Sequence, residues 1–61
     1  MAIQGNEGVG VYLRDSGYVV EHFRLEPNQD YARVLYRSHA FDTREEASDH
    51  AWQYRIKQER N

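Results

Sequence analysis

Apolar and polar residues alternate along the first two thirds of the chain in a way that predicts β-strands. Residues 9–14 place valine or leucine at every second position, between glycine, tyrosine and arginine. This period of two is typical of a strand with one buried face. The stretches 18–25 and 31–41 are rich in β-branched and aromatic residues and predict two further strands.

Two polar segments separate these strands and predict reversals of the chain. Asp15-Ser16-Gly17 suits a three-residue hairpin loop, in which a type I turn is followed by Gly17 in the left-handed region of φ. Residues 26–30 hold the only proline of the chain and two acids, and predict the second turn. The three strands should therefore follow one another as an antiparallel meander.

The last third of the chain predicts a helix that begins near Thr43 and ends near Gln58. Thr43 and Glu46 have the spacing of a capping box, in which the threonine hydroxyl accepts a hydrogen bond from the backbone N–H three residues on. Asp42 with Glu45 is an equally good box one residue earlier. Acids gather in the first half of this stretch and cations in its last turns, as the helix dipole favours.

These elements predict an α+β fold of the order β-β-β-α, a three-stranded antiparallel sheet with one C-terminal helix packed on one face. Three strands with a helix can be stable where a lone hairpin is not. The 61 residues make a single domain, which we place at residues 9–60. Residues 1–8 hold two glycines and little to bury, and predict a flexible N-terminal tail.

The length of the hairpin loop decides which side chains share a face of the sheet. A three-residue loop puts nine apolar or aromatic residues on the helix-facing side: Val9, Val11, Leu13, Val19, Phe23, Leu25, Ala32, Val34 and Tyr36. Glu21 also falls on this side, which is unfavourable unless it reaches an edge, bonds to Tyr36 or lies beside a bulge. A two-residue loop would turn the second strand over relative to the first.

The opposite face of the sheet gathers arginine, tyrosine and histidine in this register. Seven of the eight cations of the chain are arginine, and the four arginines of the strands fall together on this face. Arginines on a flat sheet can enter a DNA groove, and tyrosines among them can stack on bases. The candidate nucleic-acid contacts are Arg14, Arg24, Arg33, Arg37, Tyr12 and Tyr18. The alternatives are a plain solvated face or contact with an acidic protein.

The motif F-x-T-x-E-E-A at residues 41–47, placed after three strands, resembles the start of the helix in AP2-like and integrase amino-terminal DNA-binding modules. The resemblance covers residues 9–58 in topology, and the motif alone in sequence. It implies contact with DNA through the open sheet face, where the four strand arginines are expected. The chain departs from that group because its sheet has no lysine and its net charge is −2.

The predicted helix carries apolar residues on two sides, although a helix on a small sheet needs only one. Ala47, Ala51 and Tyr54 share a side, and the alanines favour close packing on the sheet. Trp52 and Ile56 lie about 140° round the helix from that side. Trp52 can lean into the edge of the core, form a homodimer contact with Ile56, or anchor a partner protein. The reverse assignment, with Tyr54 outside, is also open.

The side of the helix around Trp52 is the candidate protein-binding surface. Tryptophan is a common hot-spot residue of interfaces, and here acids flank it. The predicted contacts are Trp52, Ile56, Glu45, Glu46 and Asp49. The acids could imitate DNA phosphates toward a nucleic-acid-binding partner. A chain of this size and build also resembles small phage-encoded inhibitors, anti-CRISPR proteins among them.

Nothing in the sequence favours catalysis, a metal site or a cofactor. Cysteine is absent, which excludes disulfides and cysteine-ligated zinc. His22 and His39 share the predicted open face without a carboxylate beside them, and His50 fits a solvated helix face. No apolar run approaches the ~20 residues of a membrane span, and the N-terminus lacks the pattern of a secretion signal. We therefore expect a non-enzymatic, cytoplasmic binding module without a cofactor. Its expected function is nucleic-acid contact through the arginine and tyrosine face of the sheet, and the alternative is protein binding or inhibition through the helix side that carries Trp52 and Ile56.

Overall fold

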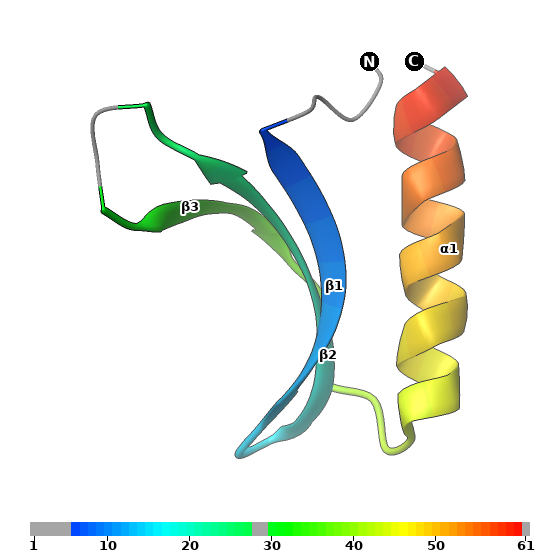
Figure 1. Cartoon of the computed structure of the whole chain (residues 1–61). Helices are drawn as coiled ribbons and strands as arrows, with labels where there is room; N and C mark the ends of the chain where they lie inside the picture. Colours follow the sequence, from blue (N-terminus) through cyan, green and yellow to red (C-terminus); the bar gives the residue numbers. More distant parts are fainter. Residues whose placement is uncertain (1–5, 28–29, 61) are drawn as a thin grey trace.

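The computed structural model describes residues 6–27 and 30–60, and these form one small sheet and one helix. The elements are β1 (Glu7–Arg14), β2 (Gly17–Leu25), β3 (Ala32–Arg37) and α1 (Arg44–Arg60). The strands are antiparallel neighbours in the order β1-β2-β3. Figure 1 shows α1 along one face of the sheet, against β1 and β2. The predicted β-β-β-α meander is confirmed.

The ends of the elements differ from the predicted ones by a few residues. β1 begins at Glu7, so the last two residues of the predicted tail belong to the sheet. Residues 1–5 of that tail lie outside the described residues, as do residues 28–29 of the predicted second turn. β3 ends at Arg37, four residues earlier than predicted, and α1 continues to Arg60.

The hairpin between β1 and β2 is one residue shorter than predicted, and this reverses the faces of β2. Arg14 pairs with Gly17, which leaves Asp15-Ser16 as the loop. Gly17 has the predicted positive φ, at 132°, but it already belongs to the strand. Every residue of β2 is therefore displaced by one position against β1, which moves its side chains to the other face. The predicted register is wrong for this reason.

A bulge in β3 inserts one extra residue opposite β2, so the residues after the bulge face the side opposite to the one that unbroken alternation would give. Phe23 pairs with Val34 but His22 pairs with Tyr36, so Leu35 is the extra residue. Tyr36 consequently shares a face with His22, whereas Val34 shares the opposite face with Phe23. A bulge beside Glu21 is one of the three features that would make the predicted position of this glutamate acceptable.

The helix packs on the sheet face that carries His22, since the Tyr54 hydroxyl of α1 reaches that imidazole. Strand pairing puts three valines of the predicted strands on this face: Val9, Val11 and Val20. Ala47 is fully buried, so the predicted core side of the helix is confirmed. Five residues predicted to face the helix lie on the other face of the sheet: Val19, Phe23, Leu25, Ala32 and Val34. We call that other face the open face.

Two local contacts fix where the helix begins. The Glu46 N–H donates to the Thr43 hydroxyl at 3.2 Å, and that hydroxyl donates to the Glu46 carboxylate at 3.0 Å. Thr43 is therefore confirmed as the cap of the helix, and Glu46 reaches back to the Thr43 hydroxyl in place of the Thr43 backbone N–H. Before the helix, Tyr18 and Phe41 exchange two backbone hydrogen bonds, of 3.0 and 2.7 Å. These bonds hold the connecting segment against the start of β2.

Candidate functional site

The six predicted nucleic-acid contacts lie on two faces of the sheet. Strand pairing and alternation place Tyr12, Arg14 and Arg37 on the open face. The same rules place Tyr18, Arg24 and Arg33 on the face that the helix packs against. The single arginine face that the sequence predicts therefore does not form, because the shorter loop and the bulge reverse parts of β2 and β3.

On the open face, a buried carboxylate holds both arginines. The Glu21 side chain is 6% exposed and accepts from the Arg14 guanidinium at 3.2 Å and from Arg37 Nε at 2.8 Å. The Arg14 guanidinium also lies over the Tyr12 ring, 5.0 Å from its centre. Glu21 therefore belongs to the open face, and its predicted position among the core residues is wrong.

On the other face, Arg24 pairs with Glu26 at 3.3 Å. Three of the four strand arginines thus have a carboxylate partner within the chain. A phosphate would have to compete with these carboxylates for the guanidinium groups.

Trp52 projects from the helix away from the sheet. Its side chain is 60% exposed, so the interpretations that bury it in the core or against the sheet are wrong. Counted at about 100° per residue, Glu45, Asp49 and Ile56 lie within about 60° of it. We call these four residues the Trp52 surface. Glu46 lies about 120° away and bonds to Thr43, so it caps the helix and stands apart from this surface.

A chain of hydrogen bonds joins the helix to the sheet. His22 Nε2 lies 2.7 Å from the Glu7 carboxylate, and His22 Nδ1 lies 2.6 Å from the Tyr54 hydroxyl. A carboxylate only accepts, so Nε2–H donates to Glu7, and in the neutral imidazole Nδ1 accepts from Tyr54. In the described part of the chain, no buried side-chain nitrogen or oxygen lacks a partner. His22 thus faces the helix, and its predicted place on the open face is wrong.

A second aromatic layer lies beside this chain. Tyr36 stacks on Tyr54 with ring centres 4.5 Å apart and planes at 12°. The Tyr36 hydroxyl lies 2.9 Å from His50 Nε2, so His50 is part of the helix–sheet contact rather than a solvated face. Burial raises the pKa of Tyr54 above its usual 10.0, and the nearby Tyr36 and Glu7 charges raise it further.

This polar contact does not follow from the predicted register, which puts His22 on the far side of the sheet and Glu7 in the N-terminal tail. The alternation of the first strand does contain a signal, because Glu7 has the same phase as Val9 and Val11. Continuing that alternation two residues further would have placed the carboxylate on the helix-facing side.

The described residues contain no group of three or more histidines, cysteines, aspartates or glutamates placed to hold a metal ion. Within the same residues, no helix is long and apolar enough to cross a membrane.

Comparison with protein-family models, curated proteins and solved structures found no match. The class that the fold defines is a small α+β domain with a three-stranded antiparallel sheet and a C-terminal helix. Its function is therefore argued from its own surfaces.

Proposed function

We propose that this chain is a protein-binding module whose main contact is the Trp52 surface. The observation that carries the proposal is the 60% exposure of Trp52 on a helix whose opposite side is fixed to the sheet. A large aromatic side chain presented in this way loses little conformational freedom on binding. When a partner buries such a residue, it typically contributes about 2 kcal/mol or more.

The charges around Trp52 favour a basic partner. Glu45 and Asp49 are exposed on the same side of the helix, and Glu59 lies on it one turn beyond Ile56. Arg55 also lies within about 60° of Trp52, so three acids surround Trp52 together with one cation. Complementary charge speeds association and selects the partner. Basic surfaces of this kind occur on nucleic-acid-binding proteins, where the acids could take the place of phosphates. Inhibition of such a protein, as by small phage inhibitors, is the specific form of this proposal.

The alternative, nucleic-acid contact of the AP2-like kind, has less support. It needs several free guanidinium groups on one face, whereas Arg14 and Arg37 share Glu21 and Arg24 pairs with Glu26. It also needs the face to be open, and Arg24 and Arg33 lie on the side of the sheet where the helix packs.

The test compares three forms of the chain against a protein captured from the native cell. After capture and purification, its affinity is measured by surface plasmon resonance for wild type, Trp52→Ala and Leu13→Ala. Leu13 is the matched control because it is 65% exposed but lies on the sheet. Loss of a hot spot should weaken binding about 30-fold for Trp52→Ala, with little change for Leu13→Ala. Equal affinity of Trp52→Ala and wild type would refute the proposal.

A further inference from the structure

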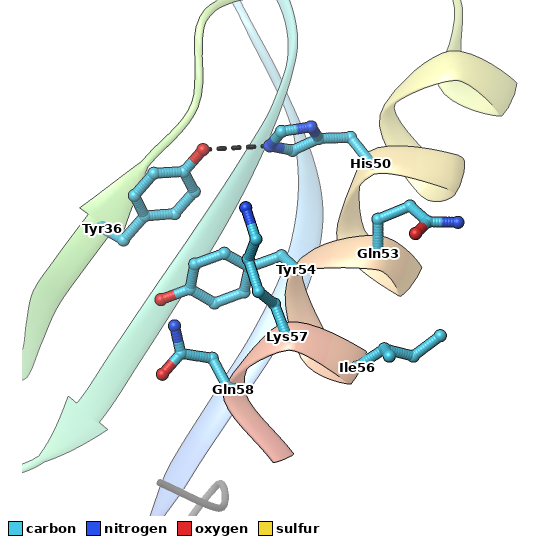
Figure 2. A pocket seen from close by; sticks show the side chains of 7 residues that line it. All are labelled: Tyr36, His50, Gln53, Tyr54, Ile56, Lys57 and Gln58. Carbon is cyan, nitrogen blue, oxygen red and sulfur yellow. Dashed lines mark hydrogen bonds between the residues drawn. The ribbon is translucent and has the colours of Figure 1, made fainter. Parts of the chain in front are cut away.

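A groove lies between the C-terminal half of α1 and the end of β3, on the other side of the helix from Trp52. Its volume is about 590 Å³, and it is lined by Tyr36, His50, Gln53, Tyr54, Ile56, Lys57 and Gln58. Figure 2 shows these side chains around it. Sites for small ligands commonly have volumes of roughly 300–1,000 Å³, so this groove is large enough to hold a small molecule.

The aromatic walls of the groove are fixed in place. Tyr36 and Tyr54 stack on each other, and each hydroxyl bonds to a different histidine, Tyr36 to His50 and Tyr54 to His22. Their ring faces are therefore held before any ligand arrives, which lowers the entropy lost on binding. Flat rings prefer offset or edge contacts with such walls. The groove is thus suited to a planar, unsaturated group.

The groove carries a positive charge within a protein of net charge −2. Lys57 is the only lysine of the chain and the only cationic lysine or arginine among the lining residues. Among the described side chains it has no ion-pair partner. Figure 2 shows it extending along the groove, with the amide of Gln58 directed to the same side as Tyr54. The Tyr54 hydroxyl is uncharged at neutral pH, because the ordinary tyrosine pKa of about 10 already lies far above it.

We propose that this groove binds a planar aromatic ring that bears a carboxylate. The ring lies against Tyr36 and Tyr54, and the carboxylate lies at the Lys57 ammonium. The amide of Gln58, which lies on the same side as Tyr54, supplies a further donor to the carboxylate. A free aromatic acid and the C-terminal aromatic residue of a protein both combine a flat ring with a carboxylate, which is attached to the ring in benzoate and to Cα in the chain terminus. The site shares Ile56 with the Trp52 surface, but its aromatic walls and Lys57 lie on the other side of the helix from Trp52, so it does not depend on the function proposed above.

The test is a titration of the isotope-labelled chain with benzoate and with benzamide, in which the NMR shifts of the backbone amides report binding. The two probes have the same ring, but only benzoate is charged. Saturable shifts are expected at Tyr36, His50, Lys57 and Gln58, with benzoate binding about fivefold more tightly, as one exposed ion pair allows. N-acetylphenylalanine, titrated in parallel, separates the two sources: tighter binding than benzoate assigns the site to a chain terminus.

Two variants make the outcome specific. Lys57→Gln should bind both probes equally, whereas Arg55→Gln, which removes a cation from the solvent side of the same helix, should keep the preference for benzoate. Circular dichroism confirms that each variant is folded. Absence of saturable shifts in the wild type, shifts centred on Arg14 and Arg37, or a preference for benzoate that survives Lys57→Gln would each overturn the proposal.

Discussion

Glu21 lies buried on the face of the sheet that no helix covers, and two guanidinium groups enclose it. Both of its carboxylate oxygens are occupied, one by Arg14 and one by Arg37. A buried carboxylate without such partners would be strongly unfavourable. The arginines at these two positions therefore have a structural role in the monomer, whatever else they contact.

Glu21→Gln should destabilise the fold, because it weakens two charge-assisted hydrogen bonds at a buried position. We expect a loss of about 1–3 kcal/mol in the free energy of unfolding, measured by urea denaturation. Glu26→Gln is the matched control, since the Glu26 carboxylate is more exposed than that of Glu21, at 23% against 6%, and its pair with Arg24 should contribute less than about 1 kcal/mol. Equal losses for the two variants would show that the Glu21 pairs are as weak as surface pairs.

Tyr54 should make the stability of the fold fall in alkaline solution. Its pKa is raised in the folded state, above the usual 10.0. The unfolded chain therefore releases this proton at lower pH than the folded chain does. The stabilisation is fully present below pH ~10 and is lost as the pH rises through the higher folded value. Tyrosinate absorbance against pH should show a late transition that Tyr54→Phe removes; Tyr31→Phe should leave it unchanged.

Among the elements, the hairpin between β1 and β2 decides the faces of the whole sheet. Gly17 has a φ of 132°, and a Cβ there would lie 2.7 Å from the Phe41 carbonyl oxygen. That oxygen accepts from the Tyr18 N–H in the bridge before the helix. The glycine thus permits both the short loop and the close approach of the connecting segment.

Gly17→Ala should destabilise the fold by more than about 1 kcal/mol, because both the backbone angle and the space exclude a methyl group. Gly10→Ala is the comparison, since its Cβ would meet only the end of the flexible Tyr12 side chain, 2.8 Å from the hydroxyl. Thermal unfolding of both variants measures the difference. A Gly17→Ala melting temperature at or above that of Gly10→Ala would contradict the expectation.

The type and order of all four elements could be predicted from sequence, because alternation, turn residues and the Thr43 box act locally. The faces of the strands could not. They depend on whether Gly17 ends the loop or begins the strand, and both choices satisfy its positive φ. They also depend on the bulge at Leu35, which allows Glu21 to lie opposite Arg37 and His22 to lie opposite Tyr36. Such pairing is non-local, so no short stretch of sequence contains it.

At the scale of the molecule, the helix divides the candidate surfaces between its two sides. The exposure of Trp52 was one of several outcomes that the helical spacing allowed, and only the packed structure chooses among them. The groove beside Lys57 could be predicted only in part. The sequence places Tyr36 on the helix-facing side and Tyr54 on the core side of the helix, and both positions are confirmed, although Tyr36 reaches that side through the bulge in β3. The bond from Tyr36 to His50 could not be predicted.

The distribution of ion pairs predicts weak contact with DNA. In size-exclusion chromatography with light scattering at low salt, wild type should elute at the same volume with and without a short duplex. Glu21→Gln, which releases Arg14 and Arg37, should move the duplex to an earlier elution volume, and added salt should reverse this shift. Strong binding by wild type that is lost in Arg33→Ala with Arg37→Ala would contradict the prediction and favour the nucleic-acid alternative. A stable dimer that Trp52→Ala dissociates would identify a second copy as the partner.

The hydrogen-bonded chain of Glu7, His22 and Tyr54 also governs how this sequence can diverge. Apolar core residues of similar volume replace one another with small losses. A member of a buried polar chain that changes alone leaves its partner unsatisfied. Positions 7, 22 and 54 must therefore change together, for instance Glu7→Val with His22→Val and Tyr54→Leu, because Glu7 loses its donor when His22 is replaced. Descendants of this sequence should carry coordinated replacements at the three positions, and a random library under selection for folding should retain the triples while losing the singles.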